Sequence, residues 1–213
     1  MTVTAGKVVN PASQAAEPKS PDKPELVVRV PAIRIVQDGI AMYLTRLCAE
    51  TFKSPNFSTA DAWSPKNRRG YQRPPSPKRF KAIAEYVRGM HGLKALLPQS
   101  IILNSRKPLI FEADPVSPDG DFGALTITSS MLPLYEVDGQ NRLGGLRRAV
   151  DEDETSEIAS YRVPVLIMDA AERITEALSF YVINTEQQCV PPDIAQPYIR
   201  PANGRQALHK VDR

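Results

Sequence analysis

The chain has 213 residues, of which 42% are hydrophobic, and its formal net charge is +3, with a pI near 8.9. This size allows one good hydrophobic core and a small appendage. The mildly basic charge permits contact with nucleic acid without demonstrating it. The two cysteines, Cys48 and Cys189, are far apart and form no C-x-x-C pair, so the sequence indicates neither a disulfide framework nor a zinc site.

Metal and membrane proteins of several kinds are excluded as well. The only histidines are His91 and His209, which excludes a histidine-rich metal centre, and we expect neither zinc nor haem. No apolar run is long enough for a transmembrane helix, and the first residues lack the apolar core of a signal peptide. We therefore expect a cytoplasmic protein without a membrane partner.

The chain divides into three parts. Residues 1–24 are rich in Ala, Ser, Lys and Pro without periodicity, which predicts a disordered N-terminal segment. Residues 25–195 carry the patterns of one compact domain. Residues 196–213 show no core-forming pattern, so we expect an irregular tail there, and the sequence leaves open whether the chain is truncated at Arg213.

The first half of the domain begins with apolar residues at 26–30 and 33–35, which predict β-structure. Pro31 interrupts it and indicates an edge or bulged strand. Apolar residues at helical spacing predict a helix over about 40–52, with Cys48 a buried thiol on its apolar face. A polar loop then leads to a second helix that begins near Arg79. Its buried stripe consists of Phe80, Ile83, Ala84 and Val87.

The second half alternates strands and helices. We expect strands at 101–103, 109–111 and 124–128, then an apolar strand before Gly139 and a helix after it. A strand at 161–168 and a helix over about 171–183 follow. The residues of that last helix expected to point inward are Ile174, Leu178 and Tyr181. This pattern predicts a compact α+β domain, a small mixed sheet with packed helices.

The most informative segment is residues 137–146, Val-Asp-Gly-Gln-Asn-Arg-Leu-Gly-Gly-Leu. We expect a strand, a tight turn and a helix here, which would place Asp138 at the strand end and Gln140 and Arg142 in the first helical turn. Unpaired N–H groups and the helix dipole make such a turn suitable for phosphate. Asp138 could coordinate a metal, Gln140 could orient a water, and Arg142 could grip phosphate. In the alternative interpretation, Asp138 only caps the helix and Arg142 is solvated.

A second candidate is a basic segment. Residues 66–81 contain seven basic residues and no acid, a charge pattern that attracts polyanions. Four of its residues are candidates for DNA contact, namely Arg68, Arg69, Gln72 and Arg73. The alternative is a solvated, proline-rich linker.

Three motifs together carry a family resemblance. They are the segment 137–146, the Gly-Tyr-Gln-Arg sequence at 70–73, and Phe-Tyr-Val-Ile-Asn-Thr-Glu-Gln-Gln at 180–188. In this order, over roughly 26–190, the chain resembles the DGQHR-domain proteins, the DndB-type DNA-sulfur-modification group. The fold of that group is similar to the ParB/sulfiredoxin-like fold. The resemblance implies a DNA-binding factor of a DNA phosphorothioation or related defence system, with a regulatory role and other proteins of that system as partners.

The resemblance also implies site residues and an alternative function. Gly139, Asn141, Arg142, Asn184 and Gln187 would bind phosphate or nucleotide. The alternative is a nucleotide hydrolase or switch that uses Mg²⁺ and a nucleoside triphosphate. Asp138 would hold the metal and Gln140 would position a catalytic water.

Two departures from relatives limit the chemistry. Asn141 stands where the family usually has His, and an amide cannot take or give a proton as imidazole does. The turn Gly139-Gln140-Asn141-Arg142 lacks the nucleophilic Cys of sulfiredoxin-type enzymes, so thiol catalysis is excluded. The sequence does not indicate an oligomeric state.

Overall fold

The computed structural model describes residues 25–89, 95–153 and 157–185, so the predicted disordered N-terminal segment 1–24 and the predicted tail 196–213 lie outside it. The described strands form one eight-stranded sheet in the order β3-β7-β4-β8-β2-β1-β6-β5. The pairs β3–β7 and β4–β8 are parallel, and the other neighbours are antiparallel. The strands are β1 (Leu26–Gln37), β2 (Ile40–Cys48), β3 (Ser58–Ala60), β4 (Ile101–Ser105), β5 (Ile110–Ala113), β6 (Phe122–Thr128), β7 (Leu134–Asp138) and β8 (Arg162–Asp169).

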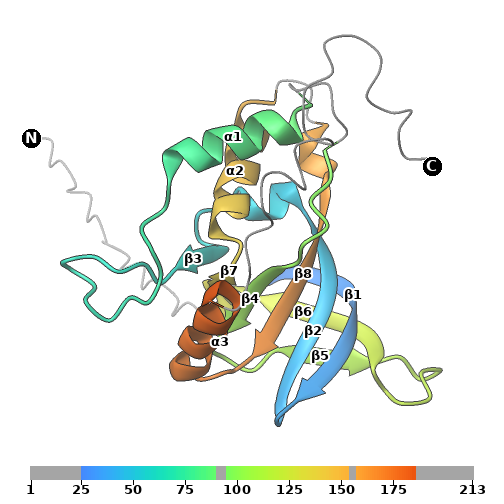
Figure 1. Cartoon of the computed structure of the whole chain (residues 1–213). Coiled ribbons are helices and arrows are strands. Elements are labelled where there is room, and N and C mark those ends of the chain that lie inside the picture. The colour runs from blue at the N-terminus through green and yellow to red at the C-terminus, as the bar shows by residue number, and fades with distance from the viewer. Residues whose placement is uncertain (1–24, 90–94, 154–156, 186–213) are drawn as a thin grey trace, which may run out of the picture.

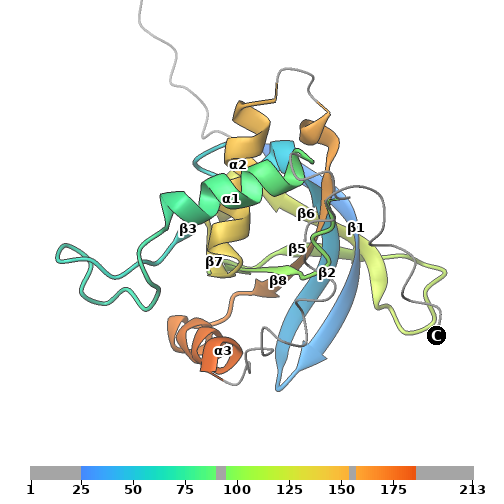
Figure 2. The same cartoon turned by 45° about the horizontal axis from the view of Figure 1, so that its top comes forward.

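Helices cover both faces of this sheet, which confirms the predicted α+β class (Figure 1). The helices are α1 (Pro77–Val87), α2 (Gln140–Asp151) and α3 (Arg173–Thr185), and short 3₁₀ turns are η1 (Ala49–Phe52), η2 (Ser129–Met131) and η3 (Ile158–Ser160). Side chains alternate across a strand, so Ile167 faces the main core with α1 and α2, and Met168 faces a smaller cluster with Phe180 of α3. Helix α3 therefore lies on the opposite face from α1 and α2 (Figure 2).

The close contact between α1 and α2 depends on two glycines in α2. A Cβ added to Gly144 would lie 2.3 Å from the Phe80 ring, and one added to Gly145 would lie 2.4 Å from Ile83. The predicted stripe of α1 thus packs directly on the backbone of α2. At its other side, α2 is fixed by Arg147, whose Nη2 donates to Glu136 at 3.0 Å and to the Ser58 hydroxyl at 2.7 Å.

The predicted helix over 40–52 is wrong: the segment forms strand β2 followed by the turn η1. Tyr43 and Leu47, four residues apart, satisfy a helical period and also the two-residue period of a strand. The missed signal is the preceding Asp38-Gly39, with φ of 48° and 76°, the left-handed pair that a tight β-hairpin turn requires. Cys48, expected to be buried, is half-buried at the end of β2.

Pro31 was expected to mark an edge or bulged strand. Strand β1 as a whole is an interior strand, paired with β2 on one side and with β6 on the other, but Pro31 itself is paired only on the β6 side. The Thr45 hydroxyl of β2 donates to the Pro31 carbonyl at 2.7 Å, so that side of Pro31 faces β2. Pairing of β1 with β2 begins only at Ile33. The missing N–H of Pro31 therefore falls outside the ladder, and the strand tolerates it. A bulge is present earlier, between Leu26 and Val28.

The face of α3 differs from the prediction. Ile174, Leu178 and Tyr181, expected to point inward, are 61%, 57% and 63% exposed. The residue of this helix that is completely buried is Glu176. The Glu176 interactions and the packing of Phe180, rather than the predicted apolar stripe, therefore hold α3 on the sheet.

Glu176 is the centre of a buried ion-pair network. Arg106 donates Nε and Nη2 to its two carboxylate oxygens at 2.8 and 2.5 Å, and Asn104 donates at 2.6 Å. The Tyr71 hydroxyl lies 3.4 Å from it. The Arg106 guanidinium also stacks 3.3 Å from the centre of the Tyr135 ring. The network thus joins α3 to β4, to β7 and to the segment around Tyr71.

Asp61 extends this network to the basic segment. Its carboxylate accepts from Arg106 at 3.1 Å, from Arg173 at 2.8 Å and from Asn67 at 2.8 Å. Burial alone would raise the pKa of Asp61, but these hydrogen bonds from Asn67, Arg173 and Arg106 outweigh it and lower that pKa. The carboxylate is therefore charged at neutral pH.

We expect Glu176→Ala to lower the free energy of unfolding by about 3 kcal/mol, because it leaves the partly buried Arg106 without its main partner. Urea denaturation measures the change. Glu172→Ala, at an exposed position directly before the same helix, is the control and should stay within about 0.5 kcal/mol of the parent. Equal stability of parent and Glu176→Ala would contradict a central role for this ion pair.

Candidate phosphate-binding site at the start of helix α2

A pocket of about 1030 Å³ lies where the N-terminus of α2 meets α3 and the segment that leads into α1. It brings together residues from all three sequence motifs. The predicted site residues that line it are Gln72, Arg73, Asp138, Gly139, Gln140, Asn141, Arg142 and Asn184. Gln187 lies outside the described residues.

The first turn of α2 presents unpaired backbone donors to this pocket. Gly139 occupies the N-cap with φ of 96°, a left-handed conformation that favours glycine, and no side chain caps the helix. The first helical bond runs from the Leu143 N–H to the Gly139 carbonyl at 2.9 Å. The N–H groups of residues 140–142 therefore have no partner within the helix. The N-cap residue is Gly139 rather than Asp138, and the Asp138 carboxylate pairs with Arg142, which differs from the simple capping interpretation.

Arg142 is held in place rather than solvated. Its Nη2 donates to Asp138 at 2.5 Å, its Nη1 donates to the Gln99 carbonyl at 2.9 Å, and its side chain is 14% exposed. The interpretation of Arg142 as a solvated surface residue is therefore wrong. An anion at this turn would meet an arginine that is already oriented, together with the free N–H groups of the helix.

Three buried amide oxygens that line the pocket have no hydrogen-bond partner among the described residues: Gln72 Oε1, Gln140 Oε1 and Asn141 Oδ1. In Gln72 the hydrogen bonds identify which end of the amide is the oxygen, because the other end, Nε2, donates to the carbonyls of Glu136 and Val137. An unpaired buried acceptor costs about 1–3 kcal/mol. Water or a ligand with hydrogen-bond donors would satisfy these atoms.

The predicted DNA-contacting residues occupy different positions. Arg73 is exposed and lines the pocket, whereas Gln72 is 1% exposed and holds its segment against β7. Arg68 and Arg69 are exposed but lie on the loop away from the pocket lining. The Arg69 carbonyl accepts from Arg173 at 2.6 Å, which ties this loop to the start of α3.

Among the pocket residues that sequence reasoning did not assign to the site, Arg79 and Gln99 bear most on the binding of an anion. Arg79 belongs to the basic segment, but it was expected to serve only as the start of a helix; in the structure it lines the pocket. Gln99 precedes β4 and contacts Arg142 across a sequence distance of 43 residues, for which the sequence carries no local signal. Asn184 lines the pocket as expected, with its Nδ2 donating to the Phe180 carbonyl at 2.7 Å.

The carboxylates available to a metal are few. Within the described residues no group of three or more His, Cys, Asp or Glu side chains could hold a metal ion. Among the described residues that line the pocket, Asp138 is the one carboxylate, and it is paired with Arg142. A Mg²⁺ ion at this pocket would therefore need most of its ligands from substrate phosphates and water.

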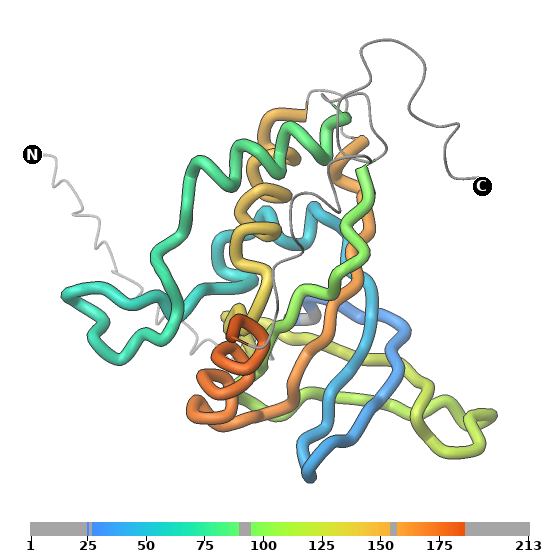
Figure 3. Tube along the Cα trace, in the orientation of Figure 1, coloured from blue at the N-terminus to red at the C-terminus, as the bar shows by residue number. Residues whose placement is uncertain are grey.

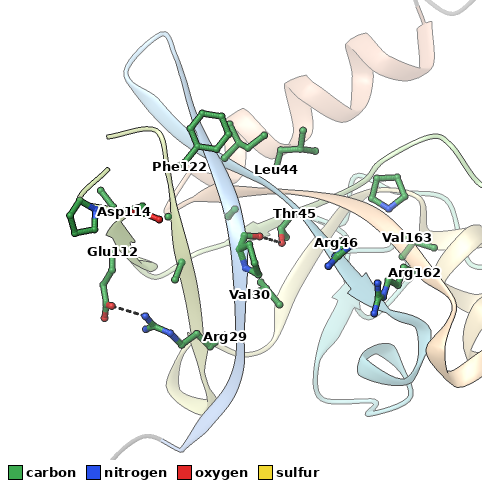
Figure 4. Close-up of a pocket in the computed structure, with 18 residues that line it drawn as sticks. Arg29, Val30, Leu44, Thr45, Arg46, Glu112, Asp114, Phe122, Arg162 and Val163 are labelled. Atoms are coloured by element: carbon green, nitrogen blue, oxygen red, sulfur yellow. Dashed lines mark hydrogen bonds and ion pairs between the residues drawn. The ribbon is translucent and has the colours of Figure 1, made fainter. Parts of the chain in front are cut away.

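A second groove, of about 1220 Å³, runs over the strands at the other end of the sheet (Figure 4). Apolar residues such as Leu44 and Phe122 line it together with Arg46 and Arg162. Arg29 in this groove is paired with Glu112 at 2.8 Å. The groove contains none of the residues that the sequence motifs single out, and the pocket at α2 therefore remains the candidate site.

Comparison with known proteins agrees with the motifs. A family model described as DndB, DNA-sulfur modification-associated, matches residues 30–190. No curated protein and no solved structure matches the chain. Among the described helices, none is long and apolar enough to cross a membrane. Since the family model covers about three quarters of the sequence, the chain belongs to the DndB family of DNA-sulfur modification-associated proteins.

Proposed function

We propose that this DndB-family chain binds DNA by holding a backbone phosphate in the pocket at the start of α2. One observation carries the proposal: among the described residues, three arginines (Arg73, Arg79 and Arg142) and one acid line a pocket into which a helix N-terminus opens. Free N–H groups, the positive end of the helix dipole and guanidinium groups all favour the same kind of ligand. Because Asp138 neutralises Arg142, the exposed Arg73 and Arg79 supply the attraction for the incoming strand.

Family membership supports a role for this binding in a DNA-sulfur modification system. Binding to DNA would allow the chain to act as a regulator in that system, including control of transcription, and its partners would be other proteins of the system. Such a role belongs in the cytoplasm. The proposal requires phosphate contacts and a basic surface, but no catalytic group.

A nucleotide is the second candidate ligand, and the unpaired amide oxygens favour it. Gln140 and Asn141 would offer acceptors after a side-chain rotation that exposes their buried amide oxygens, whereas a phosphate offers only acceptors of its own. A nucleoside triphosphate combines anionic phosphates with amino and hydroxyl donors. A Mg²⁺ ion bound with it would be held by Asp138 and would neutralise charge on the phosphates.

Hydrolysis in this second case would depend on positioning. Gln140 would orient the attacking water, and Arg142 with the helix N–H groups would hold the phosphate. Asn141 lines the pocket at the position where the family has His, and it cannot accept the proton. Turnover should therefore be slow.

Replacing Arg73 by Ala should weaken DNA binding about equally for different sequences. Each lost phosphate contact lowers the slope of log K against log salt by about one unit. Fluorescence anisotropy with labelled DNA at four salt concentrations measures both quantities. Arg34→Ala, an exposed arginine on β1, is the control and should leave the slope unchanged. If Arg73→Ala and the parent share the same affinity and slope, Arg73 makes no phosphate contact.

Arg142→Ala should abolish nucleotide or phosphate binding while the fold persists, since Arg142 completes the anion site but packs outside the main core. Calorimetric titration with ATP, GTP and CTP in the presence of Mg²⁺ is the test, with circular dichroism as the check on folding. Arg148→Ala, in the same helix and paired with Glu152, serves as the matched control. A parent that binds none of the three nucleotides would remove the nucleotide candidate and leave the DNA proposal standing.

The parent should release phosphate from nucleoside triphosphates slowly or not at all, and Asn141→His should increase the rate. The reason is that imidazole can take up a proton near neutral pH and the amide cannot. A phosphate-release assay on both proteins decides the matter. Rapid turnover by the parent, with Asn141→His neutral or harmful, would show that the reaction needs no imidazole.

A further inference from the structure

Residues 61–73, here called the arm, project from the body of the molecule beside the pocket (Figures 1 and 3). The base of the arm is fixed. The Trp63 N–H donates to the Gln72 carbonyl at 2.9 Å, and Ala62 and Gln72 form a parallel bridge. A Cβ added to Gly70 would lie 2.3 Å from the Ala62 carbonyl oxygen, so the two sides of the arm are in close backbone contact. With Asp61 anchored to Arg106 and Arg173, the arm has a defined direction.

The arm presents an unusual surface. Trp63, the only tryptophan of the chain, is 52% exposed, although tryptophan is usually largely buried. Four cations accompany it, all exposed: Lys66, Arg68, Arg69 and Arg73. The one acid of the arm, Asp61, is buried and paired. An exposed aromatic ring among uncompensated cations is the combination by which proteins bind unpaired nucleic-acid strands, through base stacking and phosphate contacts.

The arm and the pocket are continuous. Trp63 is bonded through its backbone to Gln72, and Gln72 and Arg73 line the pocket. A strand with one phosphate at the start of α2 would therefore have its neighbouring nucleotides close to the base of the arm. Basic and aromatic residues also occur at membrane surfaces, but the continuity with the arginine-lined pocket at the start of α2 favours a nucleic acid.

We propose that the arm is a second DNA-binding element, in which Trp63 stacks on a base of an unpaired or locally opened strand and Lys66, Arg68 and Arg69 contact the adjacent phosphates. This inference rests on the proposed DNA binding and adds the kind of DNA that is bound. Stacking requires an accessible base face, which an intact duplex does not offer along its length. The chain should therefore prefer a single strand, or a duplex with an opened site, over a closed duplex.

Because Trp63 is the only tryptophan, its fluorescence reports directly on the arm. The full chain is titrated with a 12-nucleotide single strand, with the corresponding duplex, and with polyphosphate as a polyanion without bases. We expect strong quenching and loss of iodide accessibility with the single strand, weaker effects with the duplex, and binding without quenching for polyphosphate. Vesicles with anionic lipids should leave the spectrum unchanged.

Variants separate stacking from charge. Trp63→Ala should weaken single-strand binding roughly 5- to 150-fold, the range for loss of one stacked base, without changing the salt slope. Trp63→Phe should restore most of the affinity, because a ring remains. Arg68→Ala and Arg69→Ala should each lower the single-strand salt slope by about 0.7. A role of Trp63 in folding alone would not produce this split between affinity and slope.

The outcomes distinguish this inference from the proposed function. DNA binding by the parent with no change in Trp63 fluorescence, and with Trp63→Ala binding as the parent does, would overturn the role of the arm and leave DNA binding intact. A spectral response to anionic vesicles, but not to DNA, would assign the arm to a membrane surface instead. Absence of DNA binding by the parent at low salt would overturn the proposed function itself, and this inference with it.

Discussion

The buried carboxylate of Glu176 constrains the geometry of the candidate site. It accepts hydrogen bonds from Arg106 and Asn104, and Arg106 in turn joins Asp61 at the base of the arm. Two walls of the pocket, α3 and the segment at Gln72 and Arg73, thus depend on one set of ion pairs. Removal of Glu176 or Arg106 alone would leave a buried or partly buried charge without its main partner, which is more costly than the absence of the whole set.

The third wall, the start of α2, has separate supports. Gly144 and Gly145 allow α1 to approach, and Arg147 fixes the helix to Glu136 and Ser58. With the body of the helix held in this way, its first turn can remain uncapped by any side chain. The N–H groups of the first turn, which have no partner within the helix, are then available to a ligand, whereas the three amide oxygens are buried. Stability is supplied by the surroundings, and the pocket retains unsatisfied polar groups, as is common at functional sites.

The parts of this arrangement that depend on residues close together in the sequence could be predicted from it. The spacing of Leu143, Leu146 and Val150 after Gly139 predicted α2, and motif order correctly placed Arg73 and Asn184 beside it. The hairpin at Asp38-Gly39 was missed because a run with Tyr43 and Leu47 fits two periods. The docking of α3 could not be predicted, since the partners of Glu176 lie about 70 or more residues away in sequence. Local patterns do not reveal that a charge will be buried.

The central claim is that a DNA phosphate occupies the first turn of α2. The backbone amide resonances of Gln140, Asn141 and Arg142 report on that turn directly, and at 23.5 kDa the chain is within reach of two-dimensional NMR. On titration with a short DNA strand, we expect these three amides to shift downfield together, with saturation at the affinity measured by anisotropy. DNA binding that shifts other resonances but leaves these three unchanged would place the phosphate elsewhere and contradict the claim.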